Sequence, residues 1–131
     1  RIVLDVRRGV GPPASQHFTF AALVATDKLI ADDPTGVAAS VRAIVKSQKA
    51  LKENPALATQ VGNRLFPAAE AEIIAELVER DLPYYDPSIS EDVVDSMNQF
   101  ARSIGLLSGL VPGGISYDEV VATQFRHLWK E

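Results

Sequence analysis

The chain has 131 residues and a mass of 14.2 kDa, which is enough for one domain. Hydrophobic residues make up 47% and charged residues 23%, a composition typical of globular rather than disordered chains. The net charge of -4 argues against a nucleic-acid surface, because such surfaces are basic. The sequence has no apolar run of about 18 residues that could span a membrane, and with no cysteine it has neither disulfides nor thiol chemistry.

Two segments near the N-terminus are predicted to be strands. In residues 1–7, Ile2, Leu4 and Val6 alternate with Val3 and Asp5, so one face of the strand is more apolar than the other. Gly11-Pro12-Pro13 then cannot continue a strand ladder. In residues 17–26 the run Phe20 to Ala25 is apolar and uncharged, as in a central strand buried on both faces.

Helices are predicted for most of the remaining sequence. A helical turn is expected at residues 27–31, followed by a long helix with Asp33 as N-cap, Pro34 at its first position and Asn54-Pro55 at its end. Further helices are expected over residues 55–66 and 68–80, from an N-cap at Ser90 to a left-handed C-cap at Gly105, and from Tyr117 onward.

These elements predict a helix-rich α/β fold, with two strands near residues 1–7 and 17–26 and about five helices packed on them. Two strands make a marginal sheet, and the run Ala21–Ala25 would have an uncovered edge. We therefore expect the chain to pair with a second copy as a homodimer, to swap a segment, or to receive strands from a longer chain. The first residue is Arg1 and the only methionine is Met97, so we expect a processed chain or a piece of a longer protein.

Several segments together resemble one protein family. They are, in order, "LVAT", "VRAIVKSQKAL", "GNRLFP", "AELVERDLPYYDPSIS", "QFARSIGLLSG" and "YDEVVATQFRHLW". This order resembles the C-terminal part of ABC-importer substrate-binding proteins of the nitrate, sulfonate and taurine type, which include binders of the thiamine pyrimidine precursor. The resemblance implies a partial two-lobe, type II periplasmic-binding-protein fold over residues 1–131. Residues 1–16 would form a strand and a hinge crossing between lobes, although a plain loop remains an alternative, and residues 17–131 a strand with its helical return.

The resemblance also implies a function. Such a receptor binds a small solute reversibly and delivers it to a membrane permease, in the periplasm or as a lipid-anchored extracellular protein. Ligands of two-lobe α/β proteins sit at the loop ends of the strands. The candidate ligand-binding residues therefore precede the second strand and combine hydroxyl, amide, imidazole and ring groups: Ser15, Gln16, His17, Phe18 and Thr19. Neither a cofactor nor a metal ion is expected, and no nucleic-acid partner.

The sequence offers little for catalysis. It has two histidines, His17 and His127, and lacks a Walker loop, an HExxH motif and a nucleophile elbow. We therefore interpret the chain as a non-enzyme. Two alternatives stay open, namely an enzyme similar to thiamine-pyrimidine synthases and the sensor lobe of a transcription regulator, since both classes resemble these receptors in architecture.

Overall fold

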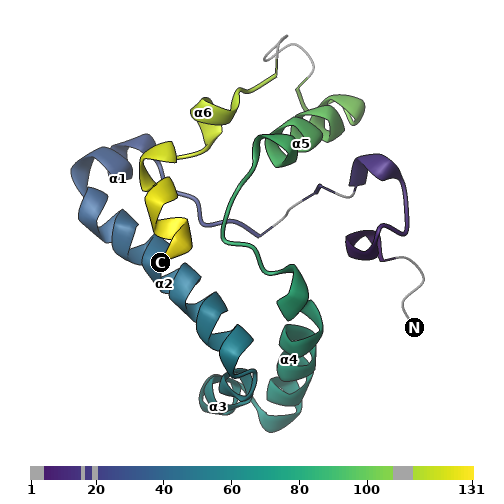
Figure 1. Cartoon of the computed structure of the whole chain (residues 1–131), viewed down its shortest axis with the longest axis vertical. Helices are drawn as coiled ribbons and strands as arrows, with labels where there is room; N and C mark the ends of the chain where they lie inside the picture. The colour runs from purple at the N-terminus through teal and green to yellow at the C-terminus, as the bar shows by residue number, and fades with distance from the viewer. Residues whose placement is uncertain (1–4, 16, 19–20, 108–113) are drawn as a thin grey trace. The chain divides into compact units, whose positions relative to one another are not determined.

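The structure is a computed structural model that describes residues 5–15, 17–18, 21–107 and 114–131 (Figure 1). All regular elements within these ranges are helical. The α-helices are α1 (Asp27–Asp32), α2 (Pro34–Glu53), α3 (Ala56–Leu65), α4 (Ala68–Asp81), α5 (Glu91–Ser103) and α6 (Tyr117–Val120). The 3₁₀-helices are η1 (Val6–Arg8), η2 (Pro13–Ser15), η3 (Leu82–Tyr84) and η4 (Thr123–Lys130).

The α/β prediction is wrong, because the described residues contain no strand. Residues 1–4 lie outside the described ranges, and Val6–Arg8 forms a 3₁₀ turn in place of the first predicted strand. Residues 21–25 have no regular structure and are exposed rather than buried. An isolated apolar run becomes a strand only when a neighbouring strand pairs with its backbone, and no described segment provides one. The resemblance implied a two-lobe fold that contains such strands, and this expectation is wrong for the same reason.

The helix ends, by contrast, confirm the predicted caps. The Asp33 carboxylate accepts a hydrogen bond from the Gly36 amide at 2.8 Å, α2 begins at Pro34, and Asn54 is its C-cap. Ser90 caps α5 by accepting from the Val93 amide at 3.3 Å. Side-chain oxygens at these positions satisfy backbone N–H groups that have no partner inside the helix, which is why local sequence determines where these helices begin.

The last predicted helix is divided in two. Helix α6 ends at Val120, because Val121 has extended backbone angles of φ -106° and ψ 120°. A 3₁₀-helix, η4, follows over Thr123–Lys130. Gly105, after α5, has the left-handed φ of 79° that its predicted C-cap role requires.

The chain divides into two compact units, and one of them comprises Ala25–Pro87 with His127–Glu131. In this unit α3 and α4 pack side by side (Figure 1), and a Cβ atom on Gly62 would lie 3.2 Å from the Cβ of Ala71. The Lys52 ammonium donates to the Tyr85 carbonyl at 2.6 Å. Its buried hydrophobic side chains, among described residues, are Val37, Val45, Ala71, Leu82 and Leu128.

The other unit comprises Arg1–Val24 with Ser88–Arg126. The Phe18 and Phe100 rings meet at a centroid distance of 5.0 Å, which holds the N-terminal segment against α5. The Tyr117 hydroxyl donates to the Ile89 carbonyl at 2.7 Å and ties α6 to the residue before the α5 cap. Val121 and Phe125 are its buried hydrophobic side chains within the described ranges.

Across the described part of the chain, no helix combines the length and apolar character that crossing a membrane requires.

Candidate functional site

The five candidate ligand-binding residues are only partly placed by the structure. Gln16 and Thr19 lie outside the described residues. The Ser15 hydroxyl donates to the Pro12 carbonyl at 2.7 Å, and His17 is exposed. The half-buried Phe18 ring packs on Phe100. The ligand-binding role of this segment stays a prediction.

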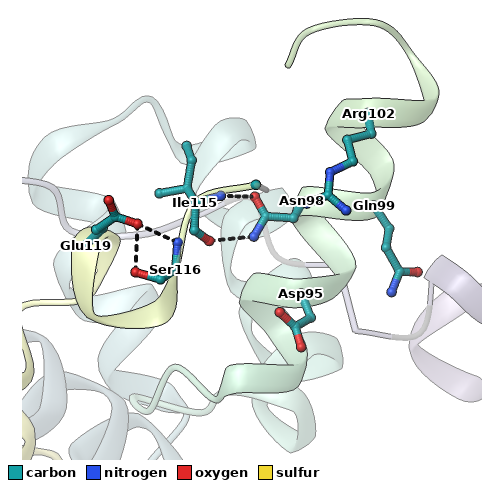
Figure 2. A pocket seen from close by; sticks show the side chains of 8 residues that line it. Asp95, Asn98, Gln99, Arg102, Ile115, Ser116 and Glu119 are labelled. Carbon is teal, nitrogen blue, oxygen red and sulfur yellow. Dashed lines mark hydrogen bonds between the residues drawn. The ribbon is translucent and has the colours of Figure 1, made fainter. Parts of the chain in front are cut away.

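A polar hollow in the same unit is a candidate site among the described residues. It has a volume of about 230 Å³ and lies between α5 and the segment that leads into α6. Figure 2 shows side chains of α5 on one side and the Ile115–Glu119 segment on the other. Its lining residues are Asp95, Asn98, Gln99, Arg102, Gly114, Ile115, Ser116 and Glu119.

Asn98 holds the two sides of the hollow together. Its carboxamide donates to the Ile115 carbonyl at 2.7 Å and accepts from the Ile115 amide at 3.2 Å (Figure 2). Both bonds are half-buried, so the backbone of Ile115 has its donor and its acceptor satisfied by one side chain. A carboxamide is the side-chain group that offers a donor and an acceptor side by side, which explains why asparagine occupies this position.

Ser116 and Glu119 form a capping box that fixes the start of α6. The Glu119 carboxylate accepts from the Ser116 amide at 2.7 Å and from the Ser116 hydroxyl at 2.6 Å (Figure 2). These two bonds, with the hydroxyl bond the larger effect, lower the pKa of Glu119 because they stabilise its charged form. Glu119 is therefore a carboxylate at neutral pH, and its charge lies at the edge of the hollow.

Arg102 brings a positive charge to the same hollow. A Cβ atom on Gly114 would meet the Nη2 atom of Arg102 at 2.1 Å, so the guanidinium rests where any larger residue would place its side chain. Gly114 also has a φ of 83°, a left-handed conformation that glycine adopts without strain. Glycine at this position allows the close approach of Arg102 and the turn of the backbone together.

The lining groups suit recognition of a small polar molecule. Two carboxylates (Asp95 and Glu119), a guanidinium (Arg102) and two carboxamides (Asn98 and Gln99) offer both charges and both hydrogen-bonding roles. Among the described residues that line the hollow there is no histidine, cysteine or lysine, and the Ser116 hydroxyl donates to the Glu119 carboxylate. Nowhere in the described ranges do three His, Cys, Asp or Glu side chains gather to hold a metal ion.

Sequence analysis did not identify this hollow. The Ser116-x-x-Glu119 spacing is a capping-box signature and could have placed the start of α6. The contact of Asn98 with Ile115 joins residues 17 positions apart in the sequence, and no spacing rule predicts it.

Comparisons with protein-family models, with curated proteins and with solved structures found no match for this chain.

Proposed function

We propose that the chain is the solute-binding component of an ABC importer, binding a small polar solute reversibly and delivering it to a membrane permease. The sequence resemblance supports the class of protein. Of the segments that carry it, VRAIVKSQKAL lies within α2, and the first five residues of QFARSIGLLSG belong to α5. The proposal concerns this function and does not include the sheet architecture that the structure corrects. The periplasm or the outer face of the membrane is the location that such a function requires.

The observation that carries the proposal is the mixed charge of the polar hollow. A guanidinium from Arg102 and a carboxylate from Asp95 line it together, and neither side chain is buried. Its volume of about 230 Å³ lies below the range of about 300–1,000 Å³ that holds drug-sized ligands. A small solute with an anionic group for Arg102 and a cationic or hydrogen-bonding group for the carboxylates fits these constraints. The nitrate, sulfonate, taurine and aminopyrimidine class contains such molecules.

Titration calorimetry of the full chain tests the proposal. The panel is nitrate, ethanesulfonate, taurine and an aminomethylpyrimidine, and we expect saturable binding of at least one of them. Arg102→Gln removes the positive charge from the hollow and is expected to weaken binding at least tenfold. Arg64→Gln is the matched control, because it removes the same charge from an exposed position on α3.

Two results would contradict the proposal. One is the absence of saturable heat with every solute in the panel. The other is equal affinity in the Arg102→Gln variant and the Arg64→Gln control, which would place any binding outside the hollow. Circular dichroism of both variants verifies that the helical content is retained.

A further inference from the structure

The polar hollow carries more negative than positive charge. Among its described lining residues, Asp95 and Glu119 each bring a carboxylate, and Arg102 brings the one cationic group. Two carboxylates and one guanidinium leave one negative charge in excess at neutral pH. Since opposite charges favour binding and like charges oppose it, a simple anion meets net repulsion in this hollow, whereas a solute that also has a cationic group does not.

Both carboxylates have oxygen atoms that no described group occupies. The two hydrogen bonds from Ser116 end on the same atom of Glu119, Oε2, and the Oε1 atom accepts none within the described ranges. Asp95 is exposed on α5, and its carboxylate takes part in no ion pair or hydrogen bond with a described group. A primary ammonium group has three N–H donors and no acceptor, so it matches oxygens of this kind. The carboxylates therefore provide the place for an amine.

The positive charge lies at the other end of the hollow. Asp95 and Arg102 are seven residues apart on α5. Seven residues make two helical turns, so the two side chains share one face of the helix, and their Cα atoms are roughly 10 Å apart along its axis. The Arg102 guanidinium lies against Gly114, and Figure 2 shows Glu119 on the opposite side of Asn98 from Arg102. The hollow thus separates its carboxylates from its guanidinium.

We propose that the solute of this hollow is a short ω-amino acid, namely a carboxylate or sulfonate with its amine at the opposite end of the molecule. This inference rests on the proposed function, since it concerns the solute that the same hollow binds. The amine lies at Asp95 and Glu119, and the acid group faces Arg102. The Gln99 carboxamide lies between the two ends on α5 and can donate to the acid group. An α-amino acid carries its amine and its acid on neighbouring atoms, so it cannot reach both ends.

Titration calorimetry of the full chain with two matched pairs of solutes tests this class. β-Alanine and L-alanine are isomers with the same charges, and they differ in the spacing between amine and acid. Taurine and ethanesulfonate share the sulfonate, and taurine alone has the amine. In each pair the first solute is expected to bind about tenfold more tightly than the second, the difference that one charge-assisted hydrogen bond makes.

The Asp95→Asn variant tests where the amine lies. It removes one carboxylate and is expected to weaken the binding of taurine about tenfold. Ethanesulfonate has no amine and is expected to bind this variant as before or more tightly. Asp92→Asn is the matched control, because it removes the same charge from an exposed position of α5 that does not line the hollow. We expect it to leave taurine binding unchanged, and circular dichroism verifies the helical content of both variants.

The failure of this inference differs from the failure of the proposed function. Ethanesulfonate that binds as tightly as taurine, or L-alanine that binds as tightly as β-alanine, overturns the ω-amino acid class, although the chain still binds a solute. The same holds if nitrate or the aminomethylpyrimidine is the one solute bound. Equal losses in Asp95→Asn and Asp92→Asn overturn the place assigned to the amine. The absence of saturable heat with every solute rejects both proposals.

Discussion

The side chain of Asn98 joins the two sides of the polar hollow, and its replacement by aspartate tests this role. The carboxylate of Asn98→Asp can accept from the Ile115 amide but cannot donate to the Ile115 carbonyl, 2.7 Å from the native donor. We expect a loss of about 1–2 kcal/mol in the free energy of unfolding, because one bond is lost and a half-buried acceptor is left unpaired.

The control for Asn98→Asp is its neighbour on α5. Gln99→Glu makes the same change from carboxamide to carboxylate at an exposed position. Urea unfolding at neutral pH compares the two variants, and we expect Gln99→Glu to stay within about 0.5 kcal/mol of the unmodified chain. Equal losses in both variants would show that added negative charge, and not the bonds to Ile115, accounts for the effect.

Glu119 gives the hollow a dependence on pH. Hydrogen bonds from Ser116 lower the pKa of Glu119 below its ordinary value of 4.5. Because the folded pKa is the lower one, the capping box contributes its full stability above the unfolded pKa and loses it as the pH falls through the folded pKa. We expect the Ser116 amide proton to be protected from exchange at neutral pH and to lose protection in acid, as the pH falls through the lowered pKa of Glu119.

Two variants separate this effect from general acid denaturation. Glu119→Gln is expected to remove the pH dependence of the Ser116 amide. Asp118→Asn removes a carboxylate from the same helical turn and is expected to leave it unchanged. The assignment to Glu119 fails if the pH profile of the Ser116 amide is the same in Glu119→Gln as in the unmodified chain.

At the scale of elements, the contact between α3 and α4 rests on a glycine. Gly62 is buried, and a Cβ atom there would lie 3.2 Å from the Cβ of the fully buried Ala71. Gly62→Val adds branched bulk at this contact, so we expect a loss of about 1–3 kcal/mol in the free energy of unfolding. Helix propensity alone favours valine over glycine by about 0.3 kcal/mol. A loss in the free energy of unfolding would therefore come from the packing of α3 against α4.

The neighbouring Asn63→Val provides the control for this contact. Asn63 is exposed on the same helix, so its replacement changes helix propensity without reaching α4. Urea unfolding followed by circular dichroism is expected to show little change for this variant. If Gly62→Val proves as stable as Asn63→Val, the close approach of the two helices does not contribute to stability.

The helices were predicted correctly, whereas the predicted strands are absent from the described residues. One physical reason accounts for both outcomes. Helix ends depend on residues within one turn, so Asp33 and Ser90 determine them locally. A strand depends on a partner that can lie anywhere in the sequence, and the apolar run ending at Ala25 has none among the described residues. The polar hollow could not be predicted for the same reason, because Asn98 bonds to Ile115, which lies 17 positions away in the sequence.

For the molecule as a whole, the small amount of buried apolar surface determines the expected thermodynamics. Within the described ranges, seven hydrophobic residues are buried, while fourteen large ones are exposed. The heat capacity change of unfolding scales with the apolar surface that unfolding exposes. A typical globular chain of this length would give about 1.6–2.0 kcal/mol/K, and we expect a clearly smaller value with a broad thermal transition.

Differential scanning calorimetry measures this heat capacity change directly. The measurement is made at low protein concentration, because any association between copies would add buried apolar surface and raise the value. Apolar surface that is already exposed in the folded state adds nothing to the heat capacity change of unfolding. The exposed side chains of Val61, Ile73 and Leu77 are therefore one reason why we expect a small value. A sharp transition with the full heat capacity change would mean that these faces are covered in the isolated chain, and would contradict the exposure that the structure shows.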